Sequence, residues 1–241
     1  MKKIEIIGLI YQSPSYLKLL VQELNKNYSL TVSGFTVSTR IVANDPTEKI
    51  AHLLTSTDVR YSVYNDPNPE DYYLNRVYRC YNYAAVTSDA DIICFINSDM
   101  VFSECWLENL VKHLKGNIPC SRLVESGKYL SGLHGISRDF GRKPENFRYD
   151  EWNNYVKDAN TEKVETGGLY MPCLFDRKIF IESGMYPEGN IYKDGVGTRN
   201  GDVVKSGDTY FFELLKKKYG LKHITVFNSL VYHIQEGEKD E

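Results

Sequence analysis

The 241-residue chain lacks long hydrophobic runs, disulfide patterns and an excess of positive charge. No window approaches 18 consecutive apolar residues, so no transmembrane helix is expected. The first apolar run, residues 6–10, is too short for a signal peptide. Lys and Arg total 29 against 32 Asp and Glu, a net charge of -3. This balance argues against a dedicated nucleic-acid binder, which usually needs a basic face. We expect a cytoplasmic protein, at most peripheral to a membrane.

Cysteine usage points to the same compartment. The five cysteines are odd in number and form no C-x-x-C pair, which argues against a disulfide framework and against a zinc site. Internal repeats and low-complexity tracts are also absent. What remains is an ordinary globular composition, 42% hydrophobic and 25% charged, which is sufficient for a buried core.

Apolar strands alternate with helical patterns along the first half of the chain. Strands are expected at residues 4–10, 36–43, 91–96 and, near the end, 224–232. Helices are expected over residues 14–24, 48–54, 72–86, 106–114, 177–183 and 206–219. Such alternation predicts an α/β fold with a mostly parallel central sheet flanked by helices. The glycine-rich stretch 187–207 is expected to be a long mobile loop that covers a site.

Polar residues follow two of these strands directly. Asn44 and Asp45 end the second strand, and Asn97, Ser98 and Asp99 end the third. Ligands in α/β sheets bind beyond the carboxyl ends of strands, and carboxylates suit Mg²⁺ or Mn²⁺. Taken alone, the Asn-Ser-Asp triplet is equally compatible with a simple turn.

Two further residues have a functional and a structural interpretation. Asp208 begins the helix at 206–219, where an acid is favoured by the helix dipole but is also able to act as a general base. His233 ends the last strand. From the residues alone, the structural role is the more common one for both.

In combination, these motifs resemble family 2 glycosyltransferases with the GT-A fold. The stretch Asn82 to Asp99 is similar to the family's Asn, small-residue helix, strand and Asp-x-Asp motif, with Asn97-Ser98-Asp99 at the motif itself. Gly207-Asp208 lies where the family usually has Glu-Asp, and Val231-Tyr232-His233 resembles its last strand, which ends in a metal-binding His. The likeness covers most of residues 4–236, in the right order.

The resemblance implies a role for each matched residue. Asp208 would be the catalytic base, and Asp99 with His233 would bind Mn²⁺ or Mg²⁺. The acceptor side would include Gly167, Gly168 and Arg199. The donor would contact Tyr11, Ser13, Asn44, Asp45, Asn82, Asn97, Ser98 and Asp99.

Three positions depart from the family pattern. Asn97 replaces the first acid of Asp-x-Asp, Met100 replaces the acid that usually follows the motif, and Gly207 replaces the Glu before the base. Metal binding would therefore depend on Asp99, while Asn97 would hydrogen-bond a ribose hydroxyl.

The sequence thus predicts a single GT-A domain, 1–241, with a nucleotide-sugar half at about 1–118 and an acceptor half at about 119–241. Its expected activity is inverting transfer of a sugar from a nucleotide-diphosphate sugar, UDP above all, to an acceptor hydroxyl. The acceptor, whether a glycan, a lipid-linked glycan, a protein or a modified nucleic acid, stays open. So do two alternatives, a sugar-phosphate nucleotidyltransferase and a catalytically inactive nucleotide-sugar-binding module.

Overall fold

The structure is a computed structural model that describes residues 1–26, 31–196 and 202–235. Its helices are α1 Pro14–Lys26, α2 Glu48–Thr55, α3 Tyr73–Val86, α4 Trp106–Val111, α5 Tyr149–Ala159, α6 Arg177–Glu182, α7 Gly207–Tyr219 and the short 3₁₀ turn η1 Pro144–Asn146. Its strands are β1 Lys2–Ile10, β2 Thr31–Val32, β3 Phe35–Asn44, β4 Tyr61–Tyr64, β5 Ile92–Ile96, β6 Met100–Phe102, β7 Asn117–Glu125, β8 Ile136–Ser137, β9 Val164–Thr166, β10 Cys173–Asp176, β11 Ile191–Tyr192, β12 Gly195–Val196, β13 Val203–Lys205 and β14 Lys222–His233.

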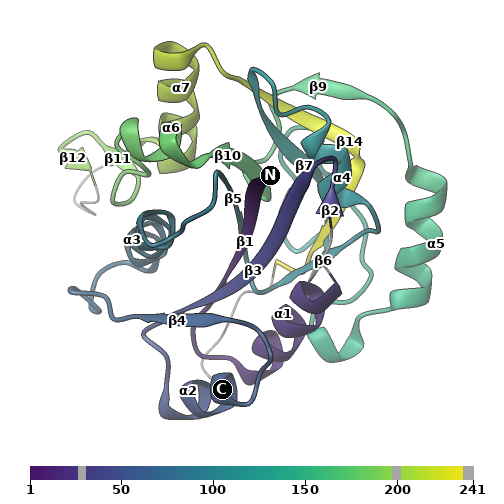
Figure 1. Cartoon of the computed structure of the whole chain (residues 1–241), viewed down its shortest axis with the longest axis horizontal. Helices are drawn as coiled ribbons and strands as arrows, with labels where there is room; N and C mark the ends of the chain where they lie inside the picture. The colour runs from purple at the N-terminus through teal and green to yellow at the C-terminus, as the bar shows by residue number, and fades with distance from the viewer. Residues whose placement is uncertain (27–30, 197–201, 236–241) are drawn as a thin grey trace.

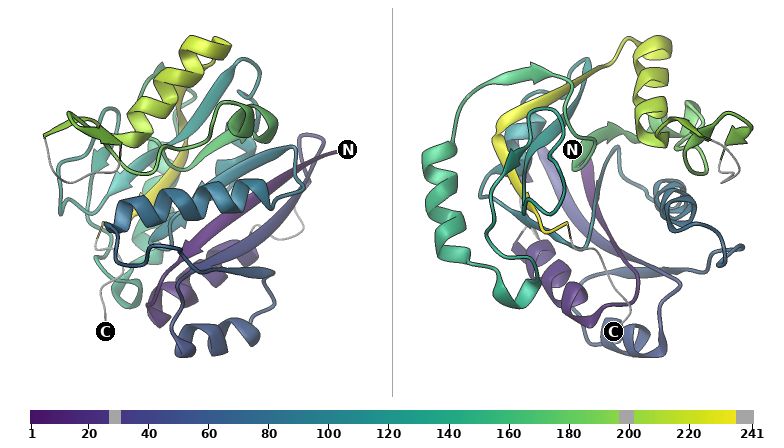
Figure 2. Two further views of the ribbon diagram at one scale, coloured as in Figure 1. Left: turned by 90° about the vertical axis from the view of Figure 1, so that its left-hand side faces the viewer. Right: turned by 180° about the vertical axis from the view of Figure 1, so that it is seen from behind.

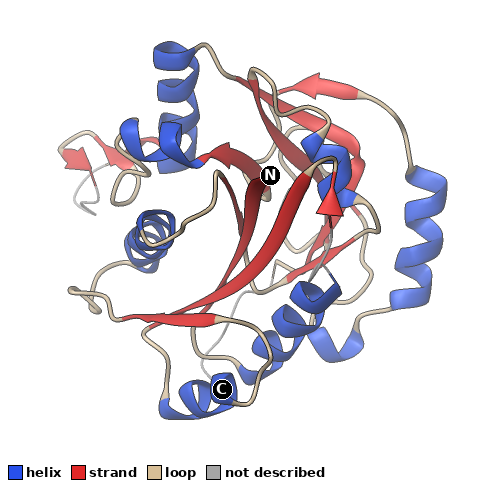
Figure 3. Cartoon of the chain, in the orientation of Figure 1, coloured by secondary structure: helices blue, strands red, loops and turns tan. Residues whose placement is uncertain are grey.

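One large sheet organises the molecule (Figure 1). Its strand order is β2-β3-β1-β5-β10-β7-β14-β6. In addition, β4 pairs with β3, β8 with β7 and β9 with β14. The pairs β4–β3, β3–β1 and β1–β5 are parallel, as are β7–β14 and β7–β8. The strand β10 runs antiparallel between the two groups. Helices flank this sheet (Figure 3), which confirms the predicted α/β architecture.

The core lies on both faces of the sheet, because β5 is apolar at every position and β1 carries apolar side chains on both of its faces. Along β1, Ile4 and Ile6 pack into one cluster with α1, α4 and α5, whereas Ile7 packs into the other with α3, α6 and α7. Side chains in a strand alternate between the faces, so a continuous apolar run serves two cores. Figure 2 shows the helices of both layers from the side and from behind.

Most expected elements of the first half are confirmed within a few residues. The start of α1 at Pro14 follows Ser13, whose carbonyl accepts from the amide of Leu17 at 3.0 Å. The helix α7 ends at Gly220, which adopts a left-handed φ of 68°. No described helix combines the length and apolar character needed to cross a bilayer.

The second half contains elements that the sequence pattern did not predict. The strand β7 and the helix α5 were both missed, and β7 proves central to the site. The stretch 187–207 was expected to be a long loop. Its described part instead holds a small antiparallel sheet of β12, β11 and β13. Each of these strands is only two or three residues long, too short to give a periodic signal.

Candidate active site

The carboxyl ends of β1, β3 and β5 meet at one edge of the sheet. Ile10 of β1 pairs with Ala43 of β3, and Gly8 of β1 pairs with Ile96 of β5. Tyr11, the pair Asn44-Asp45 and the triplet beginning at Asn97 therefore leave neighbouring strands at this edge. Parallel pairing thus gathers most of the predicted donor-side residues, as expected for an α/β site.

Tyr11 and Asp45 are joined through Arg76 of α3. The Arg76 guanidinium lies 4.9 Å from the centre of the Tyr11 ring, and its Nη1 donates to the Tyr11 hydroxyl at 3.3 Å. The same Nη1 lies 3.8 Å from Oδ2 of Asp45. Asp45 has a left-handed φ of 46°, and its Oδ1 accepts from the amide of Asp66 at 2.8 Å. Sequence analysis missed Arg76 because it is one polar residue within a helix.

Several buried polar atoms in this corner have no hydrogen-bond partner among the described residues. They are Oδ1 of Asn44, Oδ2 of Asp45 and Nε of Arg76. Buried polar atoms are normally hydrogen-bonded, and each exception needs an explanation. A ligand that supplies donors to the two oxygens and an acceptor to the nitrogen would satisfy all three.

Two other residues predicted to bind the nucleotide-sugar donor, Ser13 and Asn82, have hydrogen-bond partners within the protein. Ser13 is buried, and its hydroxyl lies 2.9 Å from that of Ser15. The Asn82 amide donates to the carbonyl of Tyr186 at 2.8 Å and accepts from its amide at 3.0 Å. Asn82 thus anchors the segment after α6 to α3.

Asp99 and His233 are brought together by strand pairing. His233 of β14 is opposite Met100 of β6, directly after Asp99. Nε2 of His233 lies 3.2 Å from Oδ2 of Asp99, whose side chain is buried. These residues are 134 positions apart in sequence, and only the tertiary fold makes them neighbours.

Glu125, which the sequence analysis missed, completes this cluster. It ends β7, and its Oε1 lies 3.2 Å from Nδ1 of His233. Its other oxygen, Oε2, accepts from the hydroxyl of Ser131. Glu125 is buried. Its only sequence signal is its place at the end of β7, a strand hidden by Pro119 and Arg122 in its pattern.

The charges in this cluster depend on one another. Burial alone would lower the pKa of His233, but Asp99 and Glu125 together raise it to about 10. Burial would raise the pKa of Asp99, yet the nearby His233 holds that pKa below its usual range. Burial acts on Glu125 in the same way, and hydrogen bonds from His233 and Ser131 lower its pKa.

The Asn-Ser-Asp triplet is held from α3. Oδ1 of Asn97 accepts from the hydroxyl of Tyr81 at 2.5 Å. Tyr81 is buried, and burial raises its pKa well above the usual value, so this hydroxyl stays a donor. Ser98 is also buried. Because Oδ1 of Asn97 is engaged, Nδ2 is the atom of this amide that could donate to a ligand.

Asp208 lies in the first turn of α7, as predicted, and is half-buried. Its Oδ1 accepts from the Ser206 hydroxyl at 2.5 Å and from the Thr209 amide at 2.7 Å. Its own amide donates to the Tyr78 hydroxyl at 3.1 Å. Burial and the nearby Asp208 carboxylate together raise the pKa of Tyr78.

A layer of tyrosine rings links Asp208 to the triplet. Tyr78 stacks on Tyr186 with ring centres 5.0 Å apart, and Tyr186 lies 6.3 Å from Tyr81. Tyr78 and Tyr81 are one turn apart on α3. The helix α3 therefore supports both polar centres of the site.

Gly207 explains one departure from the family pattern. A Cβ at this position would lie 2.4 Å from the Gly189 carbonyl oxygen and 2.6 Å from Cε2 of Tyr78. No side chain fits there without displacement of backbone, so a Glu is sterically excluded.

The predicted acceptor-side glycines lie beside Thr225 of β14. Gly167 and Gly168 follow β9 with φ values of 82° and 125°. The Gly167 carbonyl accepts from the Thr225 hydroxyl at 2.6 Å. The Tyr170 hydroxyl lies 2.8 Å from that of Thr209, next to Asp208. Arg199 lies outside the described residues.

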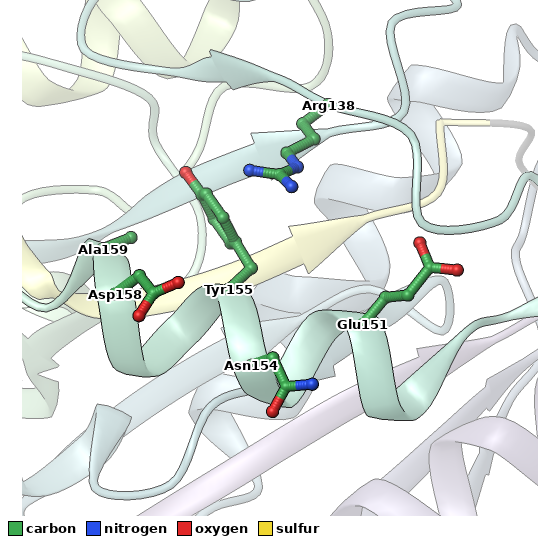
Figure 4. A pocket seen from close by; sticks show the side chains of 6 residues that line it. All are labelled: Arg138, Glu151, Asn154, Tyr155, Asp158 and Ala159. Atoms are coloured by element: carbon green, nitrogen blue, oxygen red, sulfur yellow. The ribbon is translucent and has the colours of Figure 1, made fainter.

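Two cavities formed by described residues lie away from this site. A hollow of about 370 Å³ lies beside α5 and Arg138 and is lined mainly by polar side chains (Figure 4). A second, of about 310 Å³, is mainly apolar and lies at the opposite edge of the sheet, beside Lys2 and Ile92 at the starts of β1 and β5. None of the predicted site residues lines either one. The described residues also contain no group of three or more His, Cys, Asp or Glu side chains that could hold a metal ion.

Comparison with known proteins finds similarity in structure but not in sequence. No family model and no curated protein matches the chain. Two crystal structures of S. aureus TarS, a glycosyltransferase, match 97% of it. A structure of TarS residues 1–349 gives a TM-score of 0.56 at 8% identity, and a structure of TarS gives 0.58 at 9% identity. The chain spans 60% of the first and 36% of the second. These similarities show a glycosyltransferase-like fold.

Proposed function

We propose that this chain is a divalent-metal-dependent, inverting glycosyltransferase that uses a UDP-sugar. The observation that carries the proposal is the Asp99–His233 pair, 3.2 Å apart. Asp99 follows β5 at the edge where Asn44 and Asp45 end β3. A nucleotide-sugar donor requires groups that bind the nucleoside and groups that bind the diphosphate and its metal, placed together at one sheet edge.

The unpartnered atoms near Tyr11 support a nucleoside at this corner. Uridine offers hydrogen-bond donors at N3 and at the ribose hydroxyls, which suit Oδ1 of Asn44 and Oδ2 of Asp45. Its carbonyl oxygens suit Nε of Arg76. A base stacked beside Tyr11 would also exclude water from this corner.

Asp99 and His233 would hold the metal. A carboxylate oxygen and an imidazole nitrogen are suitable ligands for Mn²⁺. Two protein ligands agree with the chemistry of Mg²⁺-type ions, which fill their remaining positions with phosphate oxygens and water. When bound, the ion neutralises the charge that develops on the departing diphosphate. Asn97 would donate through Nδ2 to an oxygen of the donor.

Asp208 would act as the general base for a single displacement. Both hydrogen bonds that its carboxylate accepts go to Oδ1. Among the described residues, no donor is bonded to Oδ2, so this oxygen is available for the proton of the acceptor hydroxyl. The helix N-terminus favours the ionised carboxylate. Tyr170, through Thr209, connects this base to the glycine-rich acceptor side.

The proposal is tested by incubating the protein with a panel of nucleotide sugars and Mn²⁺. We expect release of UDP from one UDP-sugar, and a product whose anomeric configuration is opposite to that of the donor. Proton NMR distinguishes the two anomers. Binding of UDP-sugars without any turnover would favour an inactive binding module, and retained configuration would exclude single displacement.

A further inference from the structure

We propose that Glu125 is a positioning residue that orients His233 for the metal. This inference rests on the proposed metal role of Asp99 and His233. The backbone alone aligns the three groups. Glu125 of β7 is in parallel register with His233 of β14, which is opposite Met100 of β6. Three adjacent strands thus present Glu125, His233 and Asp99 in a row.

The contacts of Glu125 show that it acts through His233. Its Oε1 lies 3.2 Å from Nδ1 of His233, and its Oε2 accepts from Ser131. Both carboxylate oxygens are engaged, and they lie on the side of the ring away from Asp99. A carboxylate placed there accepts the Nδ1 proton and leaves Nε2 to face Asp99 as a ligand.

Glu125 also supplies negative charge to the site. The position that usually carries the first acid of the motif is Asn97 here, which is neutral. With Glu125, the cluster around His233 keeps two carboxylates, and both are buried. Burial strengthens their attraction for a divalent ion because little water screens them.

Ser131 fixes Glu125 from a loop that borders the site. This loop joins β7 to β8, and Gln235 ties it down through hydrogen bonds of 3.3 Å from the Ser126 hydroxyl and 3.5 Å from the Tyr129 amide. Because Ser131 touches only one oxygen of Glu125, we expect its loss to weaken the arrangement less than loss of the carboxylate.

The first test measures Mn²⁺ affinity in the presence of UDP, by EPR of the free ion. Glu125→Leu removes the acceptor and should weaken Mn²⁺ binding about 10–100-fold, the usual effect of losing such a partner. Glu125→Gln keeps an oxygen for Nδ1, and its affinity should lie between those of Glu125→Leu and the wild type. Ser131→Ala should have a smaller effect than Glu125→Leu. The control Glu165→Gln, on a half-buried acid of β9 that pairs with Lys163 away from this cluster, should match the wild type.

UDP binding without metal separates positioning from general structural damage. It should be unchanged in every variant, because the nucleoside corner does not contact Glu125. Should Glu125→Leu fail to fold, Glu125→Gln decides the question through the second measurement. That measurement is the ¹⁵N NMR spectrum of His233 with UDP and a diamagnetic ion, which should show the proton on Nδ1.

The outcomes distinguish this inference from the function on which it rests. A wild type without Mn²⁺-dependent UDP binding overturns the metal role itself and the inference with it. A wild type with such binding, whose Glu125 variants bind Mn²⁺ equally well, overturns only the role of Glu125. A proton on Nε2 in the metal-bound wild type also overturns it.

Discussion

At the scale of single residues, the site depends on three charged groups, Asp99, Glu125 and His233, that stabilise one another. The His233 ring lies between two carboxylates: its Nε2 is 3.2 Å from Oδ2 of Asp99, and its Nδ1 is 3.2 Å from Oε1 of Glu125. Each carboxylate is buried, and an unpaired buried charge is strongly destabilising. Removal of one member should therefore change the charge of the others, so single variants here report on the whole cluster.

Asp208→Asn tests the catalytic base directly. The amide keeps the shape and the Oδ1 acceptor but cannot take a proton. Donor binding should survive, and turnover should fall by about 10²–10⁴-fold, the usual contribution of general-base catalysis. Steady-state kinetics with the identified UDP-sugar measure this. The matched control is Glu213→Gln, an exposed acid on the same helix α7; near-normal turnover of Asp208→Asn would remove Asp208 from the mechanism.

His223 should make the fold sensitive to mild acid. Burial lowers its pKa, and its Nε2 contacts the Leu169 carbonyl at 3.1 Å. A depressed pKa means that the folded state resists protonation. The stability contributed by neutral His223 is therefore complete above its unfolded pKa of about 6.5 and is lost as the pH falls below it.

The measurement is Tm from pH 8 to pH 5 for the wild type and for His223→Gln, which keeps a donor but does not titrate. The wild-type Tm should fall more steeply than that of the variant below about pH 6.5. His52→Gln, on the exposed side of α2, should follow the wild type. Parallel curves for the wild type and His223→Gln would contradict the prediction.

At the scale of elements, α3 and α7 form the support for chemistry. The Tyr78 hydroxyl of α3 accepts a hydrogen bond from the Asp208 amide in the first turn of α7, and the Tyr81 hydroxyl of α3 donates to Oδ1 of Asn97. The start of α7 also packs so tightly that Gly207 has no room for a side chain. The position of Asp208 is therefore set by contact between two helices.

Gly207→Ala should displace this contact. The new methyl group would meet the backbone of Gly189 at 2.4 Å, and overpacking of this kind costs about 1–3 kcal/mol. We expect a lower free energy of unfolding in urea together with reduced turnover. The control is Lys217→Ala, at an exposed position of α7, which should change neither the free energy of unfolding nor the turnover. An unchanged stability of Gly207→Ala would show that the segment at Gly189 yields easily.

At the scale of the whole molecule, the site joins distant parts of the chain. Asp99 belongs to the first half of the chain and His233 to the last strand, β14. Because β14 pairs with both β7 and β6, His233 is placed next to Asp99. Ligands that bind only the folded state stabilise it in proportion to the logarithm of their concentration. Metal and UDP should therefore stabilise the molecule as one unit.

A thermal shift experiment tests this coupling. UDP with Mn²⁺ should raise Tm more than UDP or Mn²⁺ alone, and saturation at 100 times Kd corresponds to about 2.7 kcal/mol. Asp99→Ala and His233→Ala should remove the increment that is due to Mn²⁺. Asp158→Ala, an exposed acid on α5, should keep it. An equal Mn²⁺ increment in Asp99→Ala would mean that the ion binds elsewhere.

The sequence by itself determined the architecture of the first half and the ends of its strands. The apolar run of β1 and the Ser-Pro start of α1 are local signals, because a buried strand and a helix N-terminus need particular neighbours along the chain. The same logic placed Asn44, Asp45 and Asp99 at strand ends, and placed Asp208 in the first turn of α7.

Only the tertiary structure decided which of these residues meet. The distance between Asp99 and His233, the link from Tyr11 through Arg76 to Asp45, and the contact of Glu125 with His233 all depend on pairing between remote segments. Local patterns carry no information on strand order, since register is set by packing across the sheet. Glu125 was not predicted for this reason. The sequence of its strand, β7, lacks a regular apolar pattern, and the role of Glu125 follows only from its contact with His233.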